Sequence, residues 1–290
     1  MKHRYAVVEA GINQPEEMKQ LAAMIDPDYA IVTLVGNSHL EGLGTLAKVA
    51  EEKSKIFTAG KKSPKVIFPE SCQNFTPFKE DSLEGKDYLV LRRGEPKSQK
   101  IGKHEAFFDF RTETETNGGS SMLLLWRHES PFFSVSLPPL SSGMASNIAL
   151  SLLAASDMGI NDQDLFERLP QYHPSTLRGK TLHGRGSQYF VDCYNANPSS
   201  MLDSITFFKE SYSSLPKLYV LGGMEELGEK EIELHNEVGK SIAVDSRDLV
   251  ILLGDKASWM ASGILDAGAK EEQVVILPNK EDAISIIEDF

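Results

Sequence analysis

The sequence predicts an α/β fold with mostly parallel sheets, divided between two domains. Short apolar runs typical of buried strands alternate with helical patterns along most of the chain. The length of 290 residues is enough for about two domains of ordinary size. We place the first domain at residues 1–175 and the second at residues 176–290.

Composition and charge narrow the possible functions. A hydrophobic content of 41% and a charged content of 25% are ordinary for a soluble globular protein. The net charge of −12 argues against nucleic acid and against anionic membranes as partners. No stretch is long enough to span a bilayer, and the amino terminus leads into a predicted strand, so we expect neither membrane insertion nor a signal peptide. Cys72 and Cys193 lack metal or disulfide spacing, which favours the cytoplasm.

The first 57 residues predict a βαβ unit. Residues 5–8 and 29–35 are apolar runs typical of buried parallel strands, and a helical pattern lies between them. Glu9 and the segment GNSH, which ends at His39, follow these two strands. The carboxyl ends of strands form the ligand-binding edge of open α/β sheets, so both are candidate site residues.

A second helix is predicted from Thr45, and Lys53 shares its apolar face with Val49 and Ala50. Burying an ammonium group without a partner costs several kcal/mol. One interpretation is that the Lys53 side chain reaches water near the helix end. The other is that burial lowers its pKa and frees the amine for chemical modification.

Residues 58–175 predict an extension of the first sheet that is partly antiparallel, followed by a buried helix. The predicted strands are at 65–68, 88–91, 106–111, 122–126 and 132–137, and the helix is at 143–158. Residues 176–290 predict a doubly wound, Rossmann-like domain from regular strand and helix alternation. Its strands are expected at 187–191, 217–221, 248–253 and 273–277, and its helices at 199–213, 230–244, 256–266 and 280–288.

The ten residues DCYNANPSSM, from Asp192 to Met201, crowd polar groups at the end of a predicted strand. Asp and Asn are poor strand formers, so strand propensity does not account for them. They form either a ligand site at the carboxyl end of the strand or an Asx-rich turn that caps the next helix. The residue types alone favour neither alternative.

The same string resembles the DSYNANPxSM signature of the Mur ligases, and it is most similar to the MurF branch. HLEGLGT, from His39 to Thr45, and LGGMEELG, from Leu221 to Gly228, also resemble segments of that family. The resemblance implies an ATP-dependent ligase for peptidoglycan precursor synthesis. It would join D-alanyl-D-alanine to UDP-MurNAc-tripeptide through an acyl phosphate, in the cytoplasm and as a monomer.

The resemblance also implies a metal site. Lys53 matches the family's lysine that CO₂ converts to a carbamate, and Glu9 and His39 match its metal-site glutamate and histidine. These three residues would be catalytic and would hold Mg²⁺, because a carbamate is an oxygen anion suited to a hard cation.

The remaining implied site residues bind the nucleotide and the dipeptide. Asn147 would contact adenine and Asp192 the ribose. Arg178 would contact the ATP phosphates, or else it is an ordinary surface arginine. The cleft that faces the dipeptide would be lined by Tyr194, Asn195 and Asn197.

The chain also departs from the family pattern. The sequence shows no phosphate-binding Gly-x-x-Gly-Lys-Thr/Ser loop, no amino-terminal nucleotide-substrate domain and no terminal Lys-Gly-Ser segment. The GKS at Gly239 lies in a helical pattern, so we interpret it as coincidence. Gly143 and Met144 stand where the family has polar residues, and Gly223 replaces an aspartate.

Three hypotheses therefore stay open. The chain is part of a MurF-type ligase, or it is a non-catalytic relative that binds a ligand or a partner. The third hypothesis is an amide ligase of the folylpolyglutamate synthase type, which the string from Asp192 to Met201 disfavours.

Overall fold

The structure is a computed structural model that describes residues 3–96, 105–114, 119–127, 130–184 and 186–290. The chain forms two compact units. The first consists of Met1–Arg111, Leu124–Ser134 and Ser146–Leu165, and the second of Thr112–Leu123, Val135–Ala145 and Phe166–Phe290. The segment from 112 to 165 thus contributes to both units.

A six-stranded sheet begins in the first unit, with its strands in the order of the sequence. The strands are β1 (Tyr29–Ile31), β2 (Lys65–Pro69), β3 (Tyr88–Arg93), β4 (Glu105–Thr114), β5 (Ser121–Arg127) and β6 (Ser130–Leu137). Neighbours from β1 to β4 pair in parallel. The strands expected at residues 65–137 are confirmed, because each falls within one of these elements.

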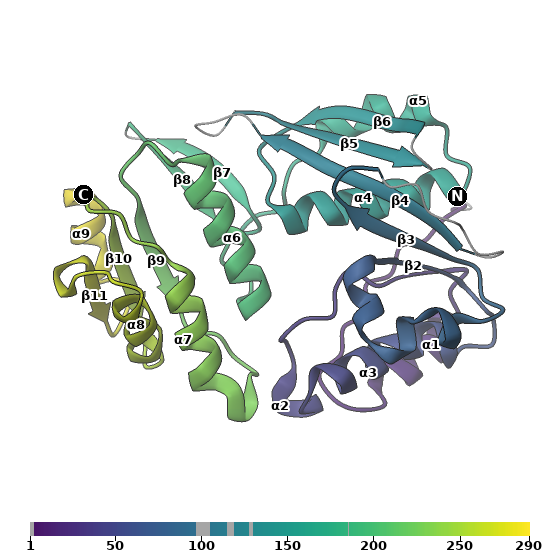
Figure 1. Ribbon diagram of the computed structural model, residues 1–290, viewed down its shortest axis with the longest axis horizontal. Helices are drawn as coiled ribbons and strands as arrows, with labels where there is room; N and C mark the ends of the chain where they lie inside the picture. The colour runs from purple at the N-terminus through teal and green to yellow at the C-terminus, as the bar shows by residue number, and fades with distance from the viewer. Residues whose placement is uncertain (1–2, 97–104, 115–118, 128–129, 185) are drawn as a thin grey trace. The chain divides into compact units, whose positions relative to one another are not determined.

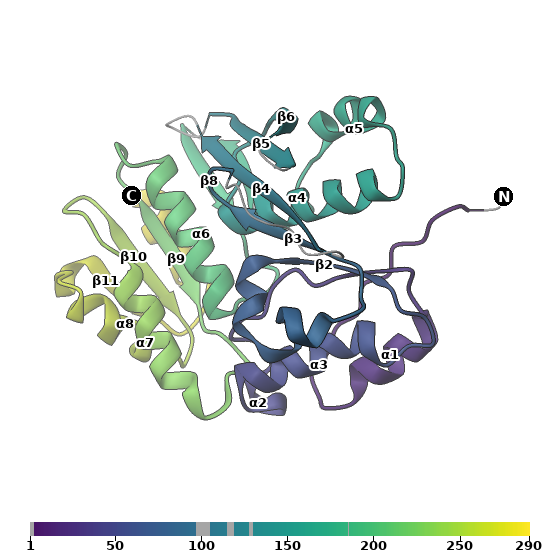
Figure 2. The same cartoon turned by 45° about the vertical axis from the view of Figure 1, so that its right-hand side comes forward.

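The prediction of a strand at residues 5–8 is wrong. These residues form no strand, and Val7 is fully exposed. β1 is the outer strand of the sheet and pairs only with β2. Figure 2 shows the amino-terminal segment running away from the rest of its unit. An apolar run becomes a strand only where a neighbour takes up its backbone hydrogen bonds, and no described strand does so here. The expected βαβ unit is therefore absent.

The longer helices of the first unit are α1 (Glu17–Ile25), α3 (Leu46–Thr58) and α4 (Ser142–Asp157). Helix α4 begins in the second unit. Two shorter helices are α2 (Leu40–Leu43) and α5 (Asp162–Arg168), of which α5 ends in the second unit. Figure 1 shows α1 and α3 lying side by side. Thr45 caps α3, because its hydroxyl accepts the Lys48 N–H at 3.3 Å. The α3 face with Val49, Ala50 and Phe57 is buried, and Phe57 packs edge-on against Phe78.

A three-stranded parallel sheet forms the centre of the second unit, in the order β11–β10–β9. Its strands are β9 (Leu218–Gly222), β10 (Leu249–Leu253) and β11 (Val274–Leu277). The helices are α6 (Pro198–Ser211), α7 (Glu231–Ser241), α8 (Ala257–Asp266) and α9 (Ala283–Asp289). The central residues of β10 from Val250 to Leu252 are buried on both faces, as expected for a parallel strand between helices.

The strand expected at 187–191 exists, but it is not part of the parallel sheet. It is β8 (Ser187–Val191), and it pairs antiparallel with β7 (Lys180–Gly184) in a separate two-stranded sheet. The sequence analysis did not predict β7. Its residues are mostly exposed, so the strand lacks the hydrophobic alternation by which strands are recognised.

Helices α7 and α8 pack backbone against backbone at two glycines. A Cβ added to Gly239 would lie 2.2 Å from the carbonyl oxygen of Met260. A Cβ added to Gly263 would lie 2.1 Å from the carbonyl oxygen of Asn236. Gly239 therefore has a packing role inside α7, which confirms that the GKS sequence is not a phosphate-binding loop.

Short 3₁₀ segments complete the described structure. They are η1 (Glu70–Asn74), η2 (Thr76–Phe78), η3 (Glu80–Leu83), η4 (Leu169–Gln171), η5 (Gly228–Lys230) and η6 (Glu271–Gln273). Among the residues that the structure describes, every helix is too short or too polar to cross a membrane.

Candidate functional site

Lys53 occupies a largely apolar setting on α3. It is half-buried, one turn from fully buried Val49 and Ala50. Its Nζ donates a hydrogen bond to the carbonyl oxygen of Leu34 at 2.6 Å, and within the described residues it has no carboxylate partner. Burial lowers the pKa of the Lys53 amine. Two interpretations of this lysine were considered. The hydrogen bond to Leu34 and the lowered pKa favour the one in which burial frees the amine for chemical modification.

The buried thiol of Cys72 also belongs to this environment. Cys72 is fully buried, and burial raises the pKa of its thiol to about 12. The Val35 N–H donates to its sulfur, while the carbonyl of the same peptide group receives the Lys53 amine. The thiol is therefore neutral near pH 7 and supplies no anion to hold a proton on Lys53.

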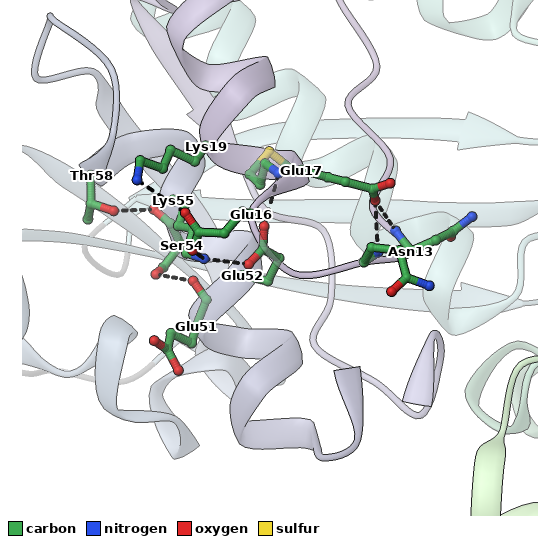
Figure 3. Close-up of polar contacts among 11 residues, drawn as sticks. Asn13, Glu16, Glu17, Lys19, Glu51, Glu52, Ser54, Lys55 and Thr58 are labelled. Atoms are coloured by element: carbon green, nitrogen blue, oxygen red, sulfur yellow. Dashed lines mark hydrogen bonds and ion pairs between the residues drawn. The ribbon is translucent and has the colours of Figure 1, made fainter. Parts of the chain in front are cut away.

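Lys55 makes the opposite set of contacts only two residues away (Figure 3). Its Nζ lies 2.5 Å from a Glu16 oxygen and 2.6 Å from an oxygen of buried Glu52. The hydrogen bonds to Glu16 and Glu52 raise the pKa of Lys55. Glu52 also accepts the Met18 N–H at 3.0 Å, so this ion pair links α3 to α1. Among the described residues, Lys53 thus has no carboxylate partner, although Glu51 and Glu52 are its neighbours on the same helix.

A pH-dependent stability test follows from the Lys53 environment. The unfolded chain keeps the lysine proton up to the ordinary pKa of 10.5, whereas the folded chain releases it at lower pH. The unfolded state binds more protons between these two values, so stability rises with pH across that window. In CO₂-free buffer, Lys53→Met is therefore expected to stabilise the chain below the folded-state pKa. Urea denaturation should show this gain shrinking as pH approaches 10.5. Exposed Lys48→Met is the control, and an equal pH profile for the two variants would contradict the prediction.

The other two residues of the expected metal site lie on different segments. Glu9 is exposed in the amino-terminal segment, and within the described residues it makes no hydrogen bond or ion pair. His39 is half-buried, has a left-handed backbone (φ 59°) and precedes α2. No interaction joins Glu9 to His39 or Lys53 in the described structure. Among the described residues, no group of three His, Cys, Asp or Glu side chains could hold a metal ion.

The turn that leads from this segment into α1 is well anchored (Figure 3). The Glu17 carboxylate accepts the N–H groups of Asn13 at 2.6 Å and Gln14 at 2.8 Å. These hydrogen bonds lower the pKa of Glu17. Gly42 of α2 packs against the same turn, because a Cβ there would lie 2.0 Å from the Asn13 carbonyl oxygen. The chain is thus fixed from Asn13 onward, and Glu9 lies before the fixed point.

The expected adenine contact, Asn147, is exposed on α4. Its backbone carbonyl accepts the Ser151 hydroxyl at 2.8 Å. Its side-chain amide makes no hydrogen bond to the described residues, so both its donor and its acceptor are available to a ligand. Asn147 belongs to the first unit, whereas the other expected nucleotide contacts, Arg178 and Asp192, belong to the second.

In the string from Asp192 onward, the contacts show the helix cap, one of the two alternatives considered for it. Asn197 caps α6: its side chain accepts the Ser200 N–H at 2.9 Å, and the Ser200 hydroxyl accepts the Asn197 N–H at 3.1 Å. Asn195 folds back on the chain, with its side-chain oxygen accepting the Ala196 N–H at 2.9 Å. Tyr194 remains 63% exposed. The helix-capping interpretation is therefore correct for Asn197, and the segment still presents free polar groups.

Asp192 and Arg178 lie on facing segments of the second unit. Asp192 accepts the Gly179 N–H at 3.2 Å and the Ser204 hydroxyl through its other oxygen. The Arg178 guanidinium lies over the Tyr194 ring, with its central carbon 3.9 Å from the ring centroid. These contacts gather Arg178, Asp192 and Tyr194 into one surface cluster.

The sequence analysis missed the residues that fix the GGMEELG loop after β9. Fully buried His235 accepts the Met224 N–H at 2.9 Å and bonds the Glu231 carbonyl at 2.7 Å through its other ring nitrogen. Lys256 donates to the Met224 carbonyl at 2.9 Å and pairs with Glu225 and Glu231. His235 and Lys256 lie in separate helical patterns, so the sequence did not indicate that both side chains bond the backbone of Met224.

Lys256 also packs against Gly223. A Cβ at Gly223 would lie 3.1 Å from the Lys256 side chain, so the lysine stem would have to shift to admit a larger residue there.

Comparison with known protein families assigns both halves of the chain. The Mur ligase middle domain model matches residues 1–155, and the model of the Mur ligase glutamate ligase domain matches residues 178–289. The chain belongs to the Mur ligase family. Together the two matched segments hold all nine residues that the sequence analysis selected.

Curated relatives of this Mur ligase chain include two UDP-N-acetylmuramoyl-tripeptide–D-alanyl-D-alanine ligases. The Treponema pallidum protein is 28% identical over 267 residues, which is 89% of this chain and 53% of that protein. The Bacillus subtilis protein is 25% identical over 98% of this chain and 58% of its own length. The chain thus spans about half the length of the curated relatives that it matches.

Solved structures show the same fold. A MurF crystal structure from Acinetobacter baumannii has a TM-score of 0.78 and 20% identity, over 99% of this chain and 58% of that one. A MurF ligase from Thermotoga maritima in complex with ADP has a TM-score of 0.74 and 21% identity, over 96% of this chain and 58% of that one. At these identities the likeness establishes the Mur ligase fold.

Proposed function

We propose that this Mur ligase is an ATP-dependent ligase of the MurF type, which joins D-alanyl-D-alanine to UDP-MurNAc-tripeptide. Family membership and the names of the curated relatives support this proposal. The observation that carries it is the environment of Lys53, a half-buried lysine whose amine has a lowered pKa and no carboxylate partner among the described residues. That environment suits a lysine that reacts with CO₂.

The reaction proceeds in two steps. The γ-phosphoryl group of ATP moves to the terminal carboxylate of the tripeptide, which gives an acyl phosphate and ADP. The amine of D-alanyl-D-alanine then attacks the acyl carbon, and the tetrahedral intermediate releases phosphate as the amide forms. Both steps carry concentrated negative charge, so cationic and hydrogen-bonding groups must surround the phosphates.

The first unit supplies the metal side of the proposal. The neutral Lys53 amine would add to CO₂ and lose a proton, which would place an oxygen anion, the carbamate, at the end of this side chain. Glu9, His39 and this carbamate would then hold Mg²⁺, which neutralises phosphate charge when bound. Lys53 fits this role by its setting. Glu9 is in a segment that no described contact fixes, so its part in the proposal comes from the match to the family alone.

The second unit and α4 supply the remaining contacts. Arg178 has a planar fork suited to phosphate oxygens, and it has no competing acidic partner in the described structure. Asp192 retains free lone pairs for ribose hydroxyls, and Asn147 can pair its unused amide with adenine. The dipeptide side consists of Tyr194, Asn195 and the amide nitrogen of Asn197. We further propose a monomer in the cytoplasm without membrane insertion.

Phosphate release tests the proposal. The purified chain, with Mg²⁺, ATP, UDP-MurNAc-tripeptide and D-alanyl-D-alanine, is expected to release phosphate only when all three substrates are present. Lys53→Ala should lower the rate at least about 100-fold, because it removes a metal ligand. Exposed Lys48→Ala, on the same helix, should leave the rate unchanged.

Two results would contradict this function. Release that needs only ATP would indicate an ATPase without ligase coupling. No release from a chain with native circular dichroism would indicate the non-catalytic alternative.

A further inference from the structure

Arg178 lies on a short arch of backbone that is fixed on both sides. Leu177 (φ 68°) and Gly179 (φ 59°) both have left-handed conformations. The Leu177 carbonyl accepts two N–H groups, from Cys193 at 2.9 Å and from Tyr194 at 3.1 Å. On the other side, the Gly179 N–H donates to Asp192 at 3.2 Å. These bonds fix the position of the Arg178 Cα relative to residues 192–194.

Close packing fixes the arch further. Gly179 has a positive φ that strains any residue with a side chain, and a Cβ there would lie 2.5 Å from the Met144 sulfur and displace that side chain. The Arg178 N–H donates to the Ser175 carbonyl at 3.1 Å. The backbone of this arginine is thus held from several directions, although its side chain is exposed.

The Arg178 side chain is held by one aromatic ring. Its guanidinium carbon is 3.9 Å from the centroid of the Tyr194 ring, and within the described residues it makes no hydrogen bond or ion pair. The five N–H donors of the guanidinium are therefore available to a ligand. A long arginine without contacts would lose rotamer freedom on binding, whereas a stacked one has already lost part of it.

We propose that Tyr194 is a positioning residue, whose ring holds Arg178 as a preorganised receptor for the polyphosphate of the nucleotide. This inference rests on the proposed function and deepens it. It assigns Tyr194 a role that acts through Arg178, in addition to its proposed place on the dipeptide side. The ring face makes the contact, so the hydroxyl is dispensable.

Titration with inorganic tripolyphosphate, followed through the Arg178 Nε–H signal in NMR spectra, tests the inference. We expect Tyr194→Leu to bind about three- to fivefold more weakly than the native chain, the loss expected for an exposed cation–π contact. Tyr194→Phe should bind as the native chain does. The control is Tyr189→Leu, which removes another exposed tyrosine of the second unit and should change nothing.

Two further readouts separate positioning from a general structural effect. The Arg178 side-chain resonances should show an upfield ring-current shift in the native chain and in Tyr194→Phe, and lose it in Tyr194→Leu. In the Arg178→Ala background, adding Tyr194→Leu should not weaken tripolyphosphate binding any further, because Tyr194 acts through the arginine.

Native affinity in Tyr194→Leu, a Phe variant as weak as the Leu variant, or no Arg178 response in the native chain would each overturn the inference. Ligation that is unaffected by Tyr194→Leu would leave the proposed function standing and remove this inference. The expected tripolyphosphate binding pattern in a chain that carries out no ligation would support the role of Tyr194 and contradict the proposed function.

Discussion

Replacing Asp248 by alanine is expected to lower the free energy of unfolding of the second unit by about 3–5 kcal/mol. Asp248 is buried and accepts the backbone N–H of Lys217 at 2.9 Å and that of Asp245 at 3.0 Å. Its carboxylate also lies 3.4 Å from the Lys217 ammonium, whose side chain is almost fully buried. Alanine would leave a buried cation without its buried counter-ion and two N–H groups without an acceptor.

Asp245 provides a matched control for this measurement. It lies at 3.5 Å from the same Lys217 ammonium, but its side chain is 67% exposed. An exposed ion pair contributes little, so Asp245→Ala should cost less than about 1 kcal/mol. Urea denaturation followed by tryptophan fluorescence measures both variants. Equal losses for Asp245→Ala and Asp248→Ala would show that burial of the Lys217–Asp248 pair does not decide stability.

The second large effect is expected for Gly239→Ala. Helix propensity alone predicts a gain of about 1 kcal/mol for this change. The new methyl group would lie 2.2 Å from the Met260 carbonyl oxygen and 3.2 Å from the Gly263 Cα. Backbone cannot move aside as a flexible side chain can, so α7 and α8 must separate. We expect a net loss of about 3 kcal/mol, because separation opens the packing around buried Val238 and Ile264.

Gly222→Ala is the control for the Gly239 prediction. Gly222 is in β9 and has nothing within 4 Å of an added Cβ. Both variants can be compared by urea denaturation, with hydrogen exchange of the α7 and α8 amides as a local readout. If Gly239→Ala is as stable as the native chain and its α7 amides exchange as slowly, the close crossing of α7 and α8 is not the determinant of packing here.

The parts of the fold that were predictable are those with strong local patterns. β10 was found because Val250, Ile251 and Leu252 form an apolar run that is buried on both faces. Residues 5–8 show the same pattern, yet they form no strand because no described neighbour pairs with them. β7 was missed for the opposite reason, since it pairs with β8 although its side chains carry no pattern.

The parts of the candidate site that could be predicted are those in which residue type and helix face determine where a side chain lies. The position of Lys53 beside Val49 and Ala50 follows from helical spacing. The capping role of Asn197 was one of two alternatives, because the same amide can serve a helix end or a ligand. The hydrogen bonds of His235 and Lys256 to the Met224 backbone could not be predicted, because they depend on how α7 and α8 pack against the loop after β9.

Direct detection of the ligated product tests the central claim. The purified chain would be incubated with Mg²⁺, ATP, UDP-MurNAc-tripeptide and isotopically labelled D-alanyl-D-alanine, and the products analysed by mass spectrometry. The account predicts a UDP-MurNAc-pentapeptide that carries the label, formed by the native chain and by Lys48→Ala and absent with Lys53→Ala. Labelled pentapeptide formed equally well by Lys53→Ala would contradict the proposed role of Lys53. Absence of the product with the correctly folded native chain would contradict the ligase function itself.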